Sequence, residues 1–139
     1  MRFETSVIQK IQRTQDIISI RFNMPKDFEH MPAKFMFIKL KSCGKEMEKH
    51  FTISSSPTKQ DYIEVTKKHT GDEFANALAA LKEGDKVTIN APVGDFKFKG
   101  EYGKIGMFSK PERICKYTST FLWTLVQFSR RNNLEAPYV

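Results

Sequence analysis

The chain has 139 residues, of which 40% are hydrophobic and 12% aromatic, and its formal net charge is +7. This length and composition are typical of one packed globular domain and exclude a disordered chain. The positive charge favours an anionic partner such as nucleotide phosphates, an acidic protein or nucleic acid. No run reaches the roughly 20 apolar residues of a membrane span, and the N-terminus does not resemble a signal peptide. We therefore expect a soluble, cytoplasmic protein.

Alternating hydrophobicity predicts a series of short strands separated by turn residues. The expected strands are residues 3–12, 16–24, 34–40, a strand that starts at Lys49, 62–67, 86–90 and 104–108. The charged residues 42–48 are expected to form a turn, and so are residues 92–95. Many short strands with regular turns predict an all-β fold, either a small antiparallel barrel or a sandwich.

Two segments have helical rather than strand periodicity. Residues 74–81 have apolar side chains at positions i, i+3, i+4 and i+7 and follow the cap-type residues 70–72, which predicts a short amphipathic helix. Apolar residues also recur at helical spacing between Pro111 and Arg131, which predicts a C-terminal helix. We expect this second helix to pack on the barrel or on a second copy of the chain.

Residues 49–57 contain the most suggestive pattern, Lys-His-Phe-Thr-Ile-Ser-Ser-Ser-Pro. In a strand, Lys49, Phe51 and Ile53 share one face, while His50 and Thr52 share the other. A cation, a flat ring and a hydroxyl so close together suit a ligand that is anionic at one end and planar at the other. An ordinary amphipathic strand that ends in a Ser-Pro turn explains this segment equally well.

Four segments, in one order, resemble motifs of a known family. Residues 32–35 are similar to a Pro-Gly-Gln-Phe strand start, and residues 49–55 to an Arg-x-Tyr-Ser-x-x-Ser motif. Residues 71–74 stand where a glycine-led loop opens a short helix, and residues 84–96 are similar to Gly-Asp-x-Val-x-Ile followed by Gly-Pro-x-Gly-x-Phe. Together, over about residues 3–108, they resemble the flavin-binding barrel of the ferredoxin–NAD(P) reductase family.

The resemblance implies a six-stranded antiparallel Greek-key barrel that binds FAD or, less often, FMN. It implies that Lys49 pairs with the pyrophosphate, Phe51 packs on the isoalloxazine and Thr52 bonds flavin N5. It places the strand end at residues 65–67 on the adenosine side and backbone N–H groups of residues 71–75 at the pyrophosphate. The residues expected to contact the flavin are Lys49, His50, Phe51, Thr52, Val65, Thr66, Lys67, Gly71, Asp72, Glu73, Phe74 and Ala75.

Several residues depart from the family pattern. Lys49 in place of arginine keeps the charge but lacks the bidentate fork that suits phosphate. Phe51 in place of tyrosine keeps the stacking face and lacks a hydroxyl, whereas Thr52 in place of serine keeps its hydroxyl. Ala75 stands where a serine or threonine often bonds phosphate, which removes a hydrogen bond typically worth about 0.5–1.5 kcal/mol.

The resemblance does not extend to the second, NAD(P)-binding domain of family reductases. Residues 104–109 resemble its first strand, but no glycine-rich loop follows them. The remaining residues are about as many as the roughly 30 of a single βαβ unit, too few for a dinucleotide domain. We expect a flavin-binding barrel at residues 1–108 and a helical tail at residues 109–139. By itself this chain is not expected to oxidise NAD(P)H, although an external redox partner or a separate subunit could supply the missing half.

Other functions are less well supported by the residues. The histidines lack a carboxylate or nucleophile partner in sequence, so no catalytic residue is assigned. Cys43 and Cys115 lie far apart without C-x-x-C spacing, so no metal site is assigned. Lysines on the expected strands could bind nucleic acid, but the phenylalanines between them are needed for a barrel core. One alternative of another class stays open: a non-enzymatic barrel with weak or no flavin binding that dimerises or docks through its C-terminal helix.

Overall fold

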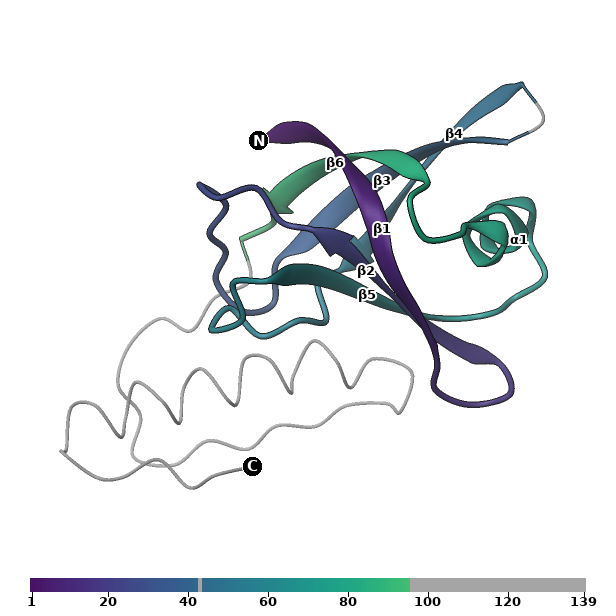
Figure 1. The fold of residues 1–139 in the computed structure, drawn as a ribbon, viewed down its shortest axis with the longest axis horizontal. Coiled ribbons are helices and arrows are strands. Elements are labelled where there is room, and N and C mark those ends of the chain that lie inside the picture. The colour runs from purple at the N-terminus through teal and green to yellow at the C-terminus, as the bar shows by residue number, and fades with distance from the viewer. Residues whose placement is uncertain (43, 96–139) are drawn as a thin grey trace, which may run out of the picture.

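A computed structural model describes residues 1–42 and 44–95, which form six strands and one helix (Figure 1). In chain order they are β1 (Arg2–Gln12), β2 (Ile17–Asn23), β3 (Phe35–Ser42), β4 (Lys45–Thr52), β5 (Tyr62–Lys68), α1 (Glu73–Ala80) and β6 (Lys86–Val93). The expected strand at residues 104–108, the C-terminal helix and the domain boundary after residue 108 lie outside the described residues.

The six strands form one antiparallel sheet in the order β4-β3-β6-β1-β2-β5. Strand β6 lies between β3 and β1, so the connection through α1 crosses from one side of the sheet to the other, as in a Greek key. The sheet curls until its edge strands meet at the bridge between Ile53 and Val65. A bond from Ser54 N to Glu64 O (2.8 Å) reinforces this closure. The prediction of an all-β antiparallel barrel with one short helix is confirmed.

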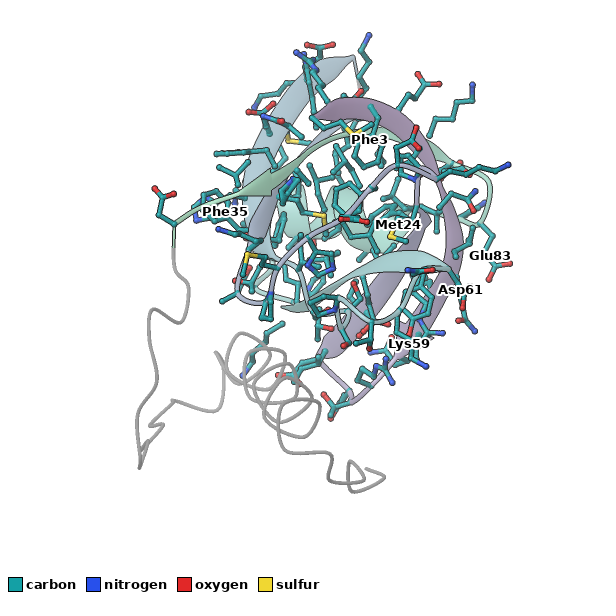
Figure 2. All side chains as sticks on the ribbon, turned by 90° about the vertical axis from the view of Figure 1, so that its left-hand side faces the viewer. Phe3, Met24, Phe35, Lys59, Asp61 and Glu83 are labelled. Atoms are coloured by element: carbon teal, nitrogen blue, oxygen red, sulfur yellow. The ribbon has the colours of Figure 1, made fainter. Side chains whose placement is uncertain are left out.

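Side chains fill the interior of the barrel (Figure 2), and its buried core is apolar, with residues from β1, β2, β3, β5, β6 and α1. Met47 and Phe51 of β4 are partly buried and pack against this core. Each fully buried aliphatic or aromatic side chain of this kind stabilises the fold by about 1.5–3 kcal/mol. Phe3 packs against this core and meets Phe28 edge to face, with ring centres 5.6 Å apart. The largest buried side chains are Phe22, Phe74, Ile20, Met36, Ile38, Ile53, Ile63, Leu78 and Ile89.

The prediction of a turn at residues 42–48 is wrong, because β3 and β4 continue through this segment as a hairpin. Strand β3 runs to Ser42, and β4 begins at Lys45. Charged side chains are compatible with these strands because they pair across the hairpin. Glu46 lies 2.5 Å from Lys39 Nζ and 3.3 Å from Lys41 Nζ. Figure 1 shows this hairpin projecting beyond the body of the barrel.

The turn expected at residues 92–95 is shorter than predicted, because β6 runs on through Val93. The chain leaves the sheet at Gly94, whose φ of +103° lies in the region that favours glycine. Phe35 pairs with Val93 at this rim of the barrel (Figure 2).

Helix α1 lies at one end of the barrel and follows β5 after a short loop (Figure 1). Its inner face buries Phe74 and Leu78, as the periodicity predicted, and also Ala75, whereas Ala77 and Leu81 of the predicted face are half-buried. At the other end of the helix, Lys10 Nζ donates to Ala79 O at 2.7 Å, which places a cation at the negative end of the helix dipole. Within residues 1–42 and 44–95, no helix has the length and apolar character needed to cross a membrane.

Candidate functional site

The carboxylate of Asp72 lies at the N-terminus of α1 and is the centre of a polar cluster. It caps the helix, because Oδ1 accepts a hydrogen bond from Ala75 N at 3.0 Å. Oδ2 accepts a second bond from Thr70 Oγ1 at 2.6 Å. The capping role follows from the sequence, in which Asp72 stands directly before Glu73, the first residue of the helix.

Two lysines from different strands converge on the same carboxylate. Lys49 Nζ of β4 donates to Asp72 Oδ1 at 2.8 Å, and Lys67 Nζ of β5 lies 3.8 Å from Oδ2. Lys49, followed by Thr70 and the backbone N–H of Ala75, holds the pKa of Asp72 well below its ordinary value. The position at the start of α1 therefore stabilises negative charge.

An aromatic pair lies directly beside this cluster. Phe51 of β4 and Phe74 of α1 have ring centres 5.6 Å apart with planes inclined by 33°. Lys49 Nζ lies 5.7 Å from the Phe74 ring centre, and Lys67 Nζ lies 5.5 Å from that of Phe51. The cations that meet the carboxylate thus also contact the ring faces.

An open hollow of about 370 Å³ lies between β4 and the start of α1. This volume is at the lower end of the range for small-molecule sites. A further ion pair lies at its edge, because Lys45 Nζ is 2.9 Å from Glu73 Oε2. The residues that line the hollow are Met47, Glu48, Lys49, Asp72, Glu73 and Phe74.

The structure brings together most of the site residues that the sequence predicted. Lys49 and Phe51 point to the same side of β4, as the alternation predicted. Lys67 reaches them from β5, and residues 71–75 supply the loop and the first turn of α1.

Four of the predicted residues have their side chains elsewhere. His50 lies on the other face of β4, with its ring 5.8 Å from Phe35 and 6.0 Å from Phe37. Val65 is buried in the core, and Thr66 bonds to hydroxyls of neighbouring segments. Thr52 is half-buried, and within the described part of the chain its hydroxyl has no hydrogen-bond partner. The roles predicted for these four residues remain predictions.

Lys45, Met47 and Glu48 belong to the same site, although the sequence placed them in a turn. A signal was present, because Met47, Lys49 and Phe51 alternate with polar residues and so share a strand face. Extending the strand of residues 49–53 backwards by two residues would have placed Met47 beside Lys49.

The fold and this cluster define a class of domain. It is an antiparallel barrel in which lysines and a helix N-terminus surround one position for an anion, and a pair of aromatic rings lies beside that position. The sequence matches the oxidoreductase FAD-binding domain family over residues 4–98, and the chain belongs to this family. The resemblance to the flavin barrel of ferredoxin–NAD(P) reductases is thereby confirmed.

The chain is also similar to individual proteins. It is 30% identical to the glycine betaine monooxygenase reductase subunit of Chromohalobacter salexigens, over 68% of this chain and 27% of that protein. It is 27% identical to the reductase component of propane 2-monooxygenase from Mycolicibacterium goodii, over 68% of this chain and 28% of that protein. The match therefore spans little more than a quarter of these curated relatives.

Among solved structures, the ferredoxin NADP+ reductase of Neisseria gonorrhoeae with bound FAD and NADP has the same fold. The TM-score is 0.61 at 12% identity, and the match covers 68% of this chain and 39% of that one. At this identity the likeness concerns the fold alone.

The donors around Asp72 fit the phosphate groups of a flavin nucleotide. They comprise two ammonium groups, one hydroxyl and one backbone N–H at a helix N-terminus, which are the groups that bind phosphate oxygens in proteins. The Asp72 carboxylate already occupies this position as an anion. The adjacent ring of Phe51 is half-buried and can pack against a planar group.

Proposed function

We propose that this chain is the FAD-binding, electron-transfer part of a reductase, with FMN as the less frequent alternative cofactor. One observation carries the proposal: Lys49, Lys67 and the N-terminus of α1 converge on one anion beside the Phe51 ring. Family membership supports the choice of FAD. A bound flavin supplies two-electron and one-electron redox chemistry, whereas the protein binds and orients it.

In this proposal each residue has a distinct task. The ammonium groups of Lys49 and Lys67 neutralise phosphate, and backbone N–H groups at the start of α1 bond its oxygens. Phe51 packs on the isoalloxazine. The Thr52 hydroxyl, at the end of β4, bonds flavin N5.

The electrons are proposed to come from and go to partners outside residues 1–139. Both curated relatives described above are reductase components or subunits of monooxygenases, which favours an oxygenase-type acceptor. The nicotinamide-binding half is supplied by another part of a longer polypeptide or by another chain. By itself the 139-residue chain should not reduce acceptors with NADH or NADPH, and clear turnover would refute this part of the proposal.

A barrel that has kept the fold but lost the cofactor is the second candidate. It is favoured by the carboxylates of Asp72 and Glu73, which lie beside the hollow and oppose an anionic ligand. In that case the chain would serve as an interaction or dimerisation module.

A direct test is to titrate the purified chain with FAD and to follow quenching of the flavin fluorescence and the visible spectrum. We expect saturable binding at one flavin per chain. Lys49→Ala should weaken FAD binding, whereas Lys86→Ala should not. Lys86 pairs with Glu4 on β1 at 3.0 Å, and neither residue lines the hollow. A chain that ignores added FAD and FMN would establish the second candidate instead.

A further inference from the structure

We propose that Asp72 is an internal competitor of the flavin phosphates, whose carboxylate holds the anion position until a phosphate-bearing ligand displaces it. Its role would be to weaken binding of the phosphate groups of FAD and FMN, while binding of the isoalloxazine ring stays unchanged. This inference rests on the proposed function, because it concerns the same site.

The contacts of Asp72 use up the donors that a phosphate requires. Lys49 Nζ and Ala75 N both donate to Oδ1, at 2.8 Å and 3.0 Å. Thr70 Oγ1 donates to Oδ2 at 2.6 Å, and Lys67 Nζ lies 3.8 Å from that atom. A phosphate oxygen can reach these donors only if the carboxylate gives up some of them.

The lysines beside the hollow are already paired with carboxylates without a ligand. These lysines come from β4 and β5, whereas the carboxylates belong to the N-cap and the first residue of α1. Their ion pairs join three ammonium groups (Lys45, Lys49, Lys67) to two carboxylates (Asp72, Glu73). Asp72 therefore cancels part of the positive charge that a pyrophosphate would meet, and removing the charge of Asp72 would leave the cluster more strongly cationic.

The exchange does not require the barrel to unfold. The side chain of Asp72 is 37% exposed and that of Lys49 is 47% exposed, so both can turn into solvent. Their ion pair is in addition screened by salt. The competition should therefore be reversible and strongest at low ionic strength.

The substitution Asp72→Asn removes the charge and keeps a good N-cap residue, so α1 should stay folded. Glu4→Gln is the matched control, because it also removes one carboxylate from a surface ion pair, on β1, outside the lining of the hollow. Both variants and the unmodified chain are titrated with FAD, FMN and riboflavin at low and high salt, with fluorescence quenching as the readout. Circular dichroism verifies that the variants are folded.

We expect Asp72→Asn to bind FAD and FMN roughly three- to tenfold more tightly at low salt. Riboflavin, which has no phosphate, should bind equally well to the variant and to the unmodified chain. The gain should shrink at high salt, and Glu4→Gln should show no such preference.

Two results would overturn the inference while leaving the proposed function intact. One is weaker FAD binding by a folded Asp72→Asn variant, which would mean that Asp72 positions Lys49 for the ligand. The other is an equal gain for riboflavin, which would mean that charge is not the cause. If no flavin binds to any of the proteins, the proposed function fails, and inorganic pyrophosphate then tests the competition alone. Tighter binding of pyrophosphate to Asp72→Asn, observed by NMR shifts of Ala75 and Asn76 amides, would support it, and unchanged binding would end it.

Discussion

Lys67 lies over the ring of Phe51, with its Nζ atom 5.5 Å from the ring centre. The antiparallel bridge between Ile53 and Val65 sets this relationship. Phe51 stands two residues before Ile53 and Lys67 two residues after Val65, so the two lie opposite each other. Alternate residues of a strand share a face, so Phe51 and Lys67 point to the same side as the buried bridge residues. The closure of the barrel thereby brings a cation and an aromatic ring to the edge of the anion position at α1.

Replacing Phe51 should separate binding of the ring from binding of the phosphate. We expect Phe51→Ala to weaken riboflavin, FMN and FAD binding alike, by about 1–3 kcal/mol, because stacking on an aromatic face is common to all three. Phe51→Tyr should retain binding. Phe37→Ala is the control, because Phe37 contacts His50 on the other face of the hairpin. Fluorescence titration measures the affinities, and a loss confined to FAD and FMN would contradict a stacking role for Phe51.

The sequence was sufficient to predict β1, β2, β5 and β6 and the face of β4 that carries the site, although not the first half of β4. Period-two alternation placed Lys49 and Phe51 together, and the apolar spacing of residues 74–81 placed Phe74 on the inner face of a helix. Both patterns are local, which explains why they could be recognised without long-range contacts.

The ion pairs of the site could not be predicted from the same patterns. Lys49 and Asp72 are 23 residues apart, and their contact depends on how the β5–α1 loop returns to β4. The hairpin of β3 and β4 was missed for a related reason. Lys39 and Glu46 neutralise each other only once the strands are paired, so the isolated segment is too charged to indicate a strand.

The rim of the barrel at Gly94 should be intolerant of any side chain. A Cβ at this position would lie 2.6 Å from Phe35 Cε1 and 2.8 Å from Phe35 Cδ1, and φ is +103°. We expect Gly94→Ala to lower the free energy of unfolding by about 2–4 kcal/mol, from strain and overpacking together. Gly84→Ala is the matched control, since its φ is +92° and, among residues 1–42 and 44–95, no heavy atom comes within 4 Å of the added Cβ. Urea unfolding measures both, and equal losses would show that the contact with Phe35 contributes nothing.

The carboxylate of Glu64 should contribute far more to stability than the surface ion pairs do. Its side chain is only 9% exposed, and it lies 2.7 Å from Arg21 Nε and 3.3 Å from an Arg13 guanidinium nitrogen. We expect Glu64→Ala to cost about 1–3 kcal/mol, because Arg21 loses its carboxylate partner and retains the bond to Gln9 Oε1. The loss is limited because Arg13, the other partner, is in part exposed to water. Glu4→Ala, which breaks an exposed pair with Lys86, should cost less than about 1 kcal/mol. Equal losses in urea unfolding would show that burial adds nothing to this pair.

His30 should make folding stability sensitive to mild acid. Burial beside Phe28 lowers its pKa below the ordinary 6.5, and the bond from Nδ1 to Met31 O opposes this shift in part. The unfolded chain therefore takes up a proton more readily than the folded one, and the free energy of unfolding should fall as the pH drops from about 7 to 5. A folded His30→Gln variant should lose this part of the pH dependence, whereas His69→Gln, at an exposed position, should retain it. Urea unfolding at several pH values decides the matter, and an identical slope in His30→Gln and the unmodified chain would assign the effect to other groups.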